Sequence, residues 1–426
     1  MESGNAAIPI ARPVAPAGPW AEHVFTVGTT GTNGKTSTTL LVAEVLRSSG
    51  AMVAAETTIG ATREPGVFTP RSESKFLDRM RDLAERGYSR LAIEVTSEAL
   101  ASGWAKKWRF DLGIFTNLTQ DHLDAHRTFE HYLASKAQLF VHLGPGCHAV
   151  LNAADPASML LQQVIPQDVS QLWYGSPLRG PFLAKPDLAV SELTISLDGT
   201  RVVLAPSEFA EQLGGSLHTQ LIGGVFAENA LAAACAGLAL KLEPKKVAEG
   251  IARLQRVPGR FEVVTREPAV IVDYAHTPDA LVRTCSAART LTQNLGGSRL
   301  IVVFGAGGNR DPNKRGPMGE AVGQIADIAI ITNDNPRKED PQLIARAIEA
   351  GCRQSGRSEV VVELDRHRAI EQAIDRARLC DVIVICGKGH EIGQEVGSET
   401  LPFDDAEVAR IIVQGSHTRR SHTQSV

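Results

Sequence analysis

The segment Thr29–Thr36, which reads TTGTNGKT, has the residue types of a phosphate-binding loop. It stands between the apolar segment HVFTVG and the helix-like segment TSTTLLVAEVLRSSG. A glycine-rich turn from a strand into a helix points backbone N–H groups and the positive end of the helix at phosphate oxygens. Lys35 adds a positive charge, and Thr36 adds a hydroxyl group for Mg²⁺. The segment therefore predicts a site for a nucleoside triphosphate.

This phosphate loop is a variant of the usual pattern. A glycine, four residues and then Gly-Lys-Ser/Thr would place the first glycine at position 29, whereas the chain has Thr29 there and glycines at positions 28 and 31. The strand, the lysine, the hydroxyl group and the helix still follow one another in the expected order. The residues predicted to surround the phosphates are Gly31, Thr32, Asn33, Gly34, Lys35, Thr36 and Ser37.

Carboxylates at strand ends could hold the Mg²⁺ that accompanies a triphosphate, because Mg²⁺ prefers hard oxygen ligands. Glu94 closes the apolar segment RLAIE, where an unpaired carboxylate would be costly. A bound cation or a structural salt bridge would each satisfy it. A second polar cluster, FTNLTQDHLDAH, follows another predicted strand and contains Asp121 and His122. Both strand ends are candidate metal sites.

Lys136 lies on the apolar face of a predicted helix. In FEHYLASKAQLFVHL it stands three or four residues from Tyr132, Leu133, Leu139 and Phe140. An inward lysine must find a partner, change its chemistry or extend its ammonium group to solvent. The pattern alone leaves these possibilities open.

The composition is that of an ordinary globular protein. The chain has 426 residues, of which 43% are hydrophobic and 22% charged, enough for two or three domains. The formal net charge of −4 argues against nucleic-acid binding, and no segment of the sequence has the length and apolar character of a membrane span. Six scattered cysteines without a Cys-x-x-Cys pair are typical of reduced thiols, so we expect a cytoplasmic protein.

Two α/β domains are predicted to position these residues. In the first, apolar strands alternate with helices, which is typical of a parallel sheet covered by helices, and a small antiparallel patch follows near residues 170–220. A Pro-Gly pair in RLQRVPGRFEVV marks a boundary and a hinge near residue 258. The second domain repeats the alternation as a doubly wound, Rossmann-like sheet. The predicted divisions are a flexible leader at 1–20, a central ATP-binding domain at 21–257, a C-terminal amino-acid-binding domain at 258–414 and a disordered tail at 415–426.

Polar segments follow four predicted strands of the second domain. They read DYAHTPD, GAGGNRDPNKR, NDNPRKED and GKGHE. The carboxyl ends of parallel strands meet at one edge of a sheet, where ligands collect. GAGGNR lacks the glycine spacing of a dinucleotide fingerprint. We therefore predict a different kind of binding site at this edge.

Taken together, these motifs resemble the Mur ligase family. GTTGTNGKT, Glu94, FTNLTQDHLDAH, YLASKAQLF, FAENALAA, VPGRFE, DYAHTPDAL, GGNRDPNKRGPM, TNDNPRKEDP and GKGHE occur in one order between about residues 21 and 410. The chain is most similar to the MurE type, which adds the third residue of the peptidoglycan stem. The resemblance implies an ATP-dependent, ADP-forming ligase that activates a carboxylate as an acyl phosphate and couples it to the amine of an amino acid.

The same resemblance implies roles around the phosphates. Lys35 and Thr36 would hold the phosphates and Mg²⁺, and Glu94 and His122 would join the metal shell. Lys136 matches the carbamylated lysine of the family. Its N6-carboxyl group would be an anion able to hold a second Mg²⁺, which would explain a lysine on an apolar face.

Further substrate contacts are implied on the same basis. ATP would bridge the two domains, with Asn229 at the adenine. The C-terminal groups implied to meet the nucleotide are Arg260, Asp273 and His276. The amino-acid pocket is implied to consist of Arg310, Asp334, Asn335, Arg337, Gly387 and Glu391. In the MurE type the DNPR motif accompanies meso-diaminopimelate, whose carboxylate Arg337 would bind and whose distal ammonium group Glu391 would receive.

Departures from the family concern the acceptor. The family's N-terminal domain, which grips the UDP part of the substrate, does not precede the phosphate loop in this sequence, and a partner protein is a candidate replacement. Where the MurE type has Ser-Ser-His and then an arginine, this chain has Thr96, Ser97, Glu98 and Trp104. We therefore expect an acceptor other than UDP-muramoyl dipeptide, either a small molecule or one borne by a carrier. Asn309 stands where an aspartate is usual, a departure that bears on diaminopimelate.

Other functions remain open. The chain could be a true UDP-N-acetylmuramoyl-dipeptide ligase that adds meso-diaminopimelate in peptidoglycan synthesis, or a non-catalytic nucleotide-binding pseudo-ligase. A folylpolyglutamate-like ligase would share the ATP chemistry but not the DNPR and GKGHE motifs. A GTPase switch is disfavoured because no Asn-Lys-x-Asp sequence follows the loop.

Replacing Lys136 tests the metal-bridging role. We expect Lys136→Ala to abolish ATP-dependent turnover with little loss of fold, because the carbamate that would hold the second Mg²⁺ could not form. Phosphate release measures turnover, and circular dichroism is the control for folding. Full activity in this variant would exclude the role.

Overall fold

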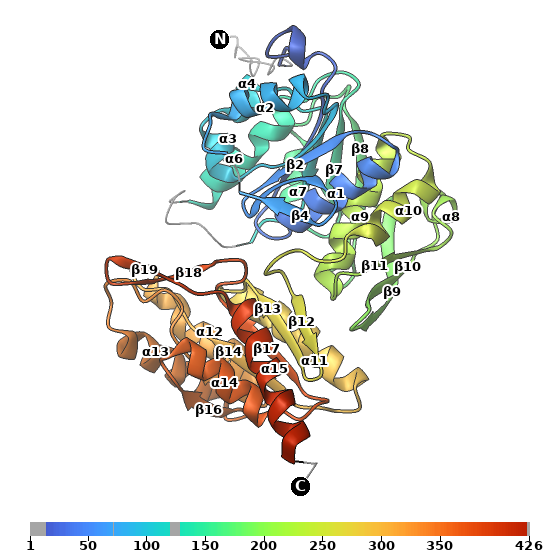
Figure 1. Ribbon diagram of the computed structural model, residues 1–426. Coiled ribbons are helices and arrows are strands. Elements are labelled where there is room, and N and C mark those ends of the chain that lie inside the picture. The colour runs from blue at the N-terminus through green and yellow to red at the C-terminus, as the bar shows by residue number, and fades with distance from the viewer. Residues whose placement is uncertain (1–13, 71, 120–127, 424–426) are drawn as a thin grey trace, which may run out of the picture. The chain divides into compact units, whose positions relative to one another are not determined.

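The segment that contains the phosphate loop forms a strand, a turn and a helix, as the sequence predicts (Figure 1). Strand β1 spans Phe25–Thr30, and helix α1 spans Lys35–Ser48. Gly34 precedes the helix with a φ of 82°, in the left-handed region that glycine adopts at little cost. The computed structural model describes residues 14–70, 72–119 and 128–423, with side chains up to residue 415.

The chain divides into two units, each with its own large sheet. The first, which we call the N-unit, ends at Gln255. The second, the C-unit, begins at Arg256 and also takes in the short segments Ile195–Gly199 and Leu221–Gly223. The predicted boundary, the pair Pro258-Gly259, comes shortly after this division.

The N-unit is built on an 11-stranded sheet. Besides β1, its strands are β2 (Val53–Thr57), β3 (Gly60–Glu64), β4 (Val67–Thr69), β5 (Arg90–Glu94), β6 (Leu112–Phe115), β7 (His148–Asn152), β8 (Ser170–Gly175), β9 (Leu188–Ser196), β10 (Gly199–Leu204) and β11 (Ser216–Thr219). Their order is β11-β10-β9-β8-β7-β6-β1-β5-β2-β3-β4. In the middle of this order, between β9 and β2, all neighbouring strands pair in parallel. The pairs β2–β3, β3–β4 and β10–β11 are antiparallel. The predicted parallel sheet with an antiparallel patch is confirmed.

Helices form two groups around this sheet. The helical elements are η1 (Pro19–Ala21), α2 (Phe76–Glu85), α3 (Ser97–Ala101), α4 (Trp104–Lys107), α6 (Phe129–Val141), α7 (Pro156–Gln162), α8 (Glu208–Gln212), α9 (Gly224–Ala239) and α10 (Pro244–Arg253). Helices α1, α9 and α10 pack together, and α3 and α7 both pack against α6. Strand β1 contacts both α1 and α6, so it is covered on both sides. This explains why the strand that leads into the phosphate loop is almost wholly buried.

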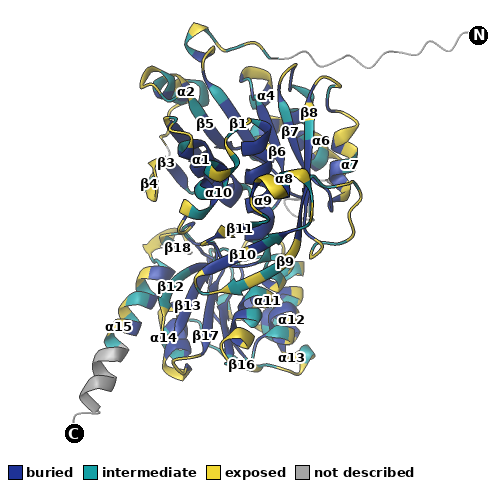
Figure 2. Cartoon of the chain, turned by 90° about the vertical axis from the view of Figure 1, so that its right-hand side faces the viewer, coloured by how far each residue is buried: buried dark blue, intermediate teal, exposed yellow. Residues whose placement is uncertain are grey.

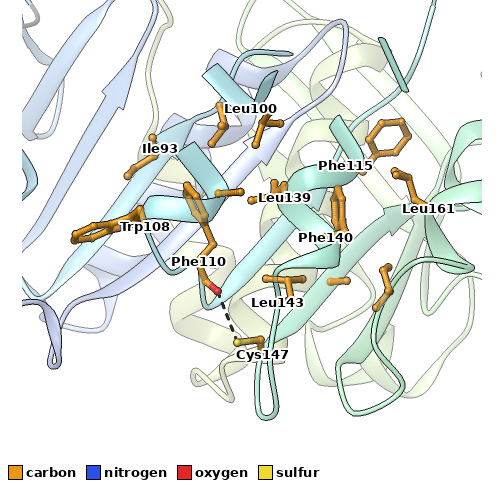
Figure 3. Packing of buried hydrophobic residues seen from close by; sticks show 14 of the residues in the cluster. Ile93, Leu100, Trp108, Phe110, Phe115, Leu139, Phe140, Leu143, Cys147 and Leu161 are labelled. Carbon is orange, nitrogen blue, oxygen red and sulfur yellow. Dashed lines mark hydrogen bonds between the residues drawn. The ribbon is translucent and has the colours of Figure 1, made fainter. Parts of the chain in front are cut away.

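Helix α6 is held against the sheet by Leu139 and Phe140, which are fully buried (Figure 3). Glycines on the facing strands make room for them. A Cβ atom at Gly28 of β1 would lie 3.0 Å from Leu139 Cδ1, and one at Gly113 of β6 would lie 3.1 Å from Phe140 Cε1. Because close-packed interiors allow little movement, this contact also fixes the direction of Lys136 on α6.

The C-unit has a six-stranded sheet in the order β12-β13-β17-β14-β15-β16. These strands are β12 (Glu262–Arg266), β13 (Ala269–Asp273), β14 (Leu300–Phe304), β15 (Ile328–Ile331), β16 (Glu359–Val362) and β17 (Val382–Cys386). Only β12 pairs antiparallel to its neighbour, and the other pairs are parallel. Figure 2 shows that the central strands are buried, as expected for a sheet covered on both faces. The predicted Rossmann-like sheet is confirmed.

The helices of the C-unit lie in two groups. They are α11 (Pro278–Asn294), η2 (Pro312–Lys314), α12 (Arg315–Ile325), α13 (Pro341–Ser355), α14 (Arg366–Arg376) and α15 (Asp405–Thr423). Helix α12 packs against α11 and α13, and α14 packs against α15. A separate antiparallel hairpin of β18 (Gly393–Val396) and β19 (Glu399–Pro402) precedes α15.

A buried ion pair ties α14 and α15 to two strand ends. The Arg366 guanidinium donates two hydrogen bonds of 2.7 Å to Asp405, and both side chains are fully buried. Arg366 also donates to the carbonyl oxygens of Asn333 at 3.1 Å and Cys386 at 3.0 Å. Burial lowers the pKa of Arg366, but the Asp405 carboxylate, together with Asp334 and Cys386, raises it, and the net shift is upward. Two of the predicted polar segments therefore start from fixed backbone positions.

Helical elements lie near both ends of the described chain. Trp20, in the predicted leader, packs on Trp108 with ring centroids 5.6 Å apart. Helix α15 ends at Thr423. The predicted leader and tail stay predictions. Among the helices of the described ranges, none has the length and apolar character needed to span a membrane.

Candidate active site

The segment after β6 holds the phosphate loop in one conformation. The Asn33 N–H donates to the Asn117 side-chain carbonyl at 3.0 Å, and Asn117 Nδ2 donates back to the Asn33 carbonyl at 3.0 Å. The Thr116 hydroxyl donates to the same Asn33 carbonyl at 2.7 Å, and the Thr32 N–H donates to the Asn117 carbonyl at 2.8 Å. Parallel pairing of β1 with β6 brings these segments together. The loop is therefore shaped by protein contacts.

Two glycines of the loop have no space for a side chain. A Cβ atom at Gly31, where φ is 150°, would lie 1.9 Å from Thr116 Oγ1. One at Gly34 would lie 2.6 Å from Asn229 Oδ1 on α9. Asn229 is buried, and its Nδ2 atom has no hydrogen-bond partner within the described part of the chain. The structure thus places the residue implied at the adenine directly beside the phosphate loop.

Glu94 lies at the end of β5, next to the start of α1. The Thr36 hydroxyl donates to Glu94 Oε2 at 2.9 Å, and the Thr58 N–H donates to the same oxygen at 2.9 Å. The Thr58 hydroxyl is a further donor at 3.1 Å. These donors are neutral, so none of them competes with a cation as a salt-bridge partner would. Thr58 could not be predicted from the sequence, because only the pairing of β2 with β5 brings it to Glu94.

Two lysines donate to carbonyl oxygens of the loop. Lys35 Nζ lies 2.8 Å from Thr32 O, and Lys136 Nζ lies 2.7 Å from Gly31 O. Lys136 Nζ also lies 4.2 Å from the centroid of the Tyr132 ring. Only 1% of Lys136 is exposed, so its ammonium group does not extend to solvent. Of the possibilities that the sequence leaves open, this position favours a partner or altered chemistry at the loop.

Part of the predicted metal shell cannot be placed. His122 and its neighbours Asp121, Asp124 and His126 lie outside the described residues. Across residues 14–70, 72–119 and 128–423, no group of three or more His, Cys, Asp or Glu side chains could hold a metal ion. The role of His122 stays a prediction. Ser37 is described, and it is buried in the first turn of α1.

The residues predicted to face the acceptor lie on α3 and α4. The Thr96 hydroxyl accepts a hydrogen bond of 3.2 Å from a backbone N–H and caps α3. Ser97 is buried, whereas Glu98 is exposed. The Trp104 ring stacks on Phe76 with centroids 4.0 Å apart and an interplanar angle of 20°. Thr96 and Trp104 therefore each have a contact within the protein, and their role at the acceptor stays a prediction.

In the C-unit, the polar segments lie at one sheet edge, as predicted, because β13, β17, β14 and β15 are parallel neighbours. Asn335 Nδ2 donates to Glu391 Oε2 at 2.9 Å. A Cβ atom at Gly387 would lie 2.2 Å from Asp334 Oδ2. That buried oxygen has no hydrogen-bond partner within the described ranges. Four of the residues predicted to contact the amino acid therefore lie together as two pairs, Asn335 with Glu391 and Asp334 with Gly387.

Arg337 is oriented by the neighbouring hairpin. Its Nε atom donates to Glu395 Oε2 of β18 at 2.7 Å, and Nη1 donates to Gly308 O at 2.9 Å. A Cβ atom at Gly307 would lie 3.0 Å from Arg337 Nη1 and 3.6 Å from Arg310 Cγ, so both predicted arginines border this glycine. Glu395 could not be predicted from the sequence, because nothing in the hairpin sequence indicates that it pairs with Arg337.

Lys388 is a third residue of the site that was not predicted from the sequence. It lies inside the GKGHE motif, is fully buried and donates to Asn335 Oδ1 at 3.0 Å and to Glu391 Oε2 at 3.0 Å. Burial raises the pKa of Glu391, but the hydrogen bonds from Asn335 and Lys388 lower it, and the net shift is downward. Glu391 therefore stays ionised at neutral pH. The sequence feature that could have indicated Lys388 is its place between two glycines in GKGHE.

The residues implied at the nucleotide gather around Tyr274. The Arg260 guanidinium lies 4.4 Å from the centroid of the Tyr274 ring, and His276 Nδ1 lies 2.7 Å from the Tyr274 carbonyl oxygen. Asp273 accepts hydrogen bonds from two backbone N–H groups and a threonine hydroxyl. Burial raises the pKa of Asp273 more than Arg260 lowers it. These three residues form one cluster in the C-unit.

Family models match both units. The model described as Mur ligase middle domain matches residues 29–237, and the one described as Mur ligase, glutamate ligase domain matches residues 259–389. The chain is 40% identical over 403 residues to the UDP-N-acetylmuramoyl-L-alanyl-D-glutamate--2,6-diaminopimelate ligase of Solibacter usitatus, covering 92% of this chain and 78% of that protein. It is 36% identical to the ligase of the same name from Alkaliphilus metalliredigens, with the same coverage.

Solved structures are similar over most of the chain. One of a UDP-N-acetylmuramoyl-L-alanyl-D-glutamate--2,6-diaminopimelate ligase matches with a TM-score of 0.66 and 30% identity, covering 95% of this chain and 80% of that one. The UDP-N-acetylmuramate-alanine ligase of Thermotoga maritima also matches with a TM-score of 0.66, covering 93% of this chain and 76% of that one. At 18% identity, this second likeness shows the fold alone.

The lack of space at Gly31 gives a test of the loop. In Gly31→Ala the new methyl group would displace the loop from Thr116, so we expect ATP to bind at least about tenfold more weakly, in line with the cost of overpacking. Titration with a fluorescent ATP analogue measures the affinity. Gly50→Ala is the matched control, because Gly50 has a φ of 84° but nothing lies within 4 Å of its Cβ position. Equal affinities in the two variants would contradict the importance of the close approach.

Proposed function

The chain belongs to the Mur ligase family, and from this premise we propose that it joins 2,6-diaminopimelate to the D-glutamate carboxylate of UDP-N-acetylmuramoyl-L-alanyl-D-glutamate. The observation that carries the proposal is the 40% identity over 92% of the chain to a ligase named for these substrates. The phosphate loop, Glu94 and Lys136 support it, because their arrangement suits phosphoryl transfer.

The proposal differs from what the sequence alone favours. The departures at Thr96 and Trp104 suggest another acceptor, and Asn309 departs from the pattern that accompanies diaminopimelate. The relatives, in contrast, support the UDP-muramoyl dipeptide and diaminopimelate. Thr96 and Trp104 have capping and stacking contacts of their own. Asn309 adopts a φ of 52°, which asparagine tolerates, and its Oδ1 atom accepts the Lys338 N–H at 3.1 Å. Each of these three departures therefore has a structural explanation that does not involve the acceptor.

The chemistry begins with a poor electrophile. A carboxylate must be activated, and transfer of the γ-phosphoryl group of ATP to one of its oxygens gives an acyl phosphate and ADP. The amine of the amino acid then attacks the carbonyl carbon, the C–O bond to phosphate breaks, and the products are an amide and inorganic phosphate. Lys35 and the N–H groups of the loop would stabilise charge on the transferred group, since positioning and electrostatics supply most phosphoryl-transfer catalysis.

A divalent cation suits the N-unit residues. Thr36 Oγ1 and Glu94 Oε2 lie 2.9 Å apart beside the loop, and both are hard oxygen donors of the kind that Mg²⁺ prefers. When bound, Mg²⁺ would neutralise charge on the phosphate oxygens. We propose from the family resemblance that Lys136 is N6-carboxylated. Its buried position, 2.7 Å from a loop carbonyl, supports a role at the phosphates.

The C-unit would bind the amino acid. Arg337 offers a planar guanidinium group for a carboxylate, and Glu391 offers an ionised carboxylate for a distal ammonium group. The two charges have opposite signs and lie at the same sheet edge, which suits a substrate that carries both groups. This supports diaminopimelate over an amino acid with an uncharged side chain.

A second candidate is the same ligase chemistry on another carboxylate acceptor, free or borne by a carrier. Glu98 favours it, because this exposed acidic residue stands where the family resemblance predicts a histidine. Such a change would weaken attraction for a negatively charged acceptor.

An assay with defined substrates decides between the two. The protein is incubated with ATP, Mg²⁺ and either UDP-N-acetylmuramoyl-L-alanyl-D-glutamate or another carboxylic acid as the acceptor. Each acceptor is tested with diaminopimelate and with lysine, and phosphate release and product mass are followed. We expect phosphate and the tripeptide product only when diaminopimelate is present. The Lys35→Met variant controls for contaminating enzymes and should be inactive. Release with another acid but not with the dipeptide would support the second candidate, and no release with any acceptor would contradict the ligase proposal.

A further inference from the structure

Lys388 is a fully buried lysine at the amino-acid edge of the C-unit. It follows β17, and its Nζ atom donates to Asn335 Oδ1 at 3.0 Å, to Glu391 Oε2 at 3.0 Å and to the carbonyl oxygen of Gly393. An ammonium group has three N–H donors and no acceptor. These three oxygens therefore use its full donor capacity.

The backbone on both sides of Lys388 is fixed by close contacts. Gly387 and Gly389 have φ values of 115° and 55°, in the region that favours glycine. A Cβ atom at Gly387 would lie 2.2 Å from Asp334 Oδ2, and one at Gly389 would lie 2.7 Å from Tyr274 Cβ. The loop that contains Lys388 is therefore in close contact with two other polar segments of this sheet edge, those of Asp334 and Tyr274. These backbone contacts direct the Lys388 side chain inward.

Three hydrogen bonds, one of them from Lys388, set which way the Asn335 amide points. Asn335 Oδ1 accepts from Lys388 Nζ and from the Glu395 N–H, each at 3.0 Å. Asn335 Nδ2 donates to Glu391 Oε2 at 2.9 Å. If the amide were rotated by half a turn, its NH₂ group would face two donors and its oxygen would face a carboxylate. With Lys388 in place, only one orientation satisfies every group.

We propose that Lys388 is a positioning residue for the amino-acid substrate, acting through Asn335 and Glu391 without contacting the substrate. Lys388 and Asn335 both bind Oε2 of Glu391, which directs the ammonium group of the substrate to Oε1. The inference rests on the proposed function, because it assumes that the amino acid binds at this edge.

A lysine that served only to stabilise the loop would behave differently. Its loss would lower the stability of the C-unit and would change ATP and amino-acid binding together. A positioning lysine sets the orientation of two particular side chains, so its loss should weaken amino-acid binding selectively.

Calorimetric titration of the full chain separates these roles. In Lys388→Met, which keeps the length of the side chain but not its donors, we expect diaminopimelate to bind about 10- to 100-fold more weakly, the range expected when hydrogen bonds to charged groups are lost. The affinity for ATP should stay unchanged. Lys388→Arg keeps a positive charge and N–H donors, so it should lose less affinity than Lys388→Met.

Arg299→Met is the matched control. Arg299 pairs with Asp381 at 2.8 Å, next to the amino ends of β14 and β17, the ends opposite the proposed site. Like Lys388→Met, this variant removes the charged partner of a carboxylate, but it should leave diaminopimelate binding unchanged. Equal affinity for diaminopimelate in Lys388→Met and the unmodified protein would overturn the proposal, as would equal losses in Lys388→Met and Arg299→Met.

A crystal structure of Lys388→Met without substrate keeps the test independent of the proposed function. We expect the Asn335 side chain or the Glu391 carboxylate to be displaced by more than about 0.5 Å, the tolerance of a preorganised site. Unchanged positions of both groups would overturn the positioning role. If the unmodified protein bound no diaminopimelate, the proposed amino acid would be wrong, and this structure alone would decide the role of Lys388.

Discussion

The candidate active site of the N-unit depends on the close approach of the phosphate loop to the segment after β6. Gly31 leaves no room for a side chain beside Thr116, and this allows the reciprocal hydrogen bonds between Asn33 and Asn117. The same approach brings the Gly31 carbonyl within 2.7 Å of Lys136 Nζ. Loop, helix α6 and sheet edge therefore form one arrangement, in which each part fixes the others.

The C-unit brings its polar segments together in a similar way. Its polar segments also follow parallel strands, and glycines again let one loop lie against another. Lys136 and Lys388 are both among the largest fully buried side chains of the protein. Each donates to oxygens of a loop at a proposed site. A buried lysine needs a full set of partners, so each lysine holds its loop in a defined conformation.

Much of this architecture could be predicted from local sequence. Alternating apolar strands and helices indicate the two sheets, and the carboxyl ends of parallel strands indicate where polar segments meet. Contacts between distant segments could not be predicted. Thr58 reaches Glu94 only through strand pairing, and Glu395 reaches Arg337 only through the hairpin. The stacking of Trp104 on Phe76 could not be predicted either, because these two residues are far apart in the sequence.

We propose above all that the protein activates a carboxylate by transferring the γ-phosphoryl group of ATP to it. Isotope transfer from the acceptor tests this most directly. With UDP-N-acetylmuramoyl-L-alanyl-D-glutamate labelled with ¹⁸O in the reacting carboxylate, one labelled oxygen should leave with each phosphate as the amide forms. Mass spectrometry of the released phosphate should therefore show the label. Amide formation with unlabelled phosphate would contradict the account.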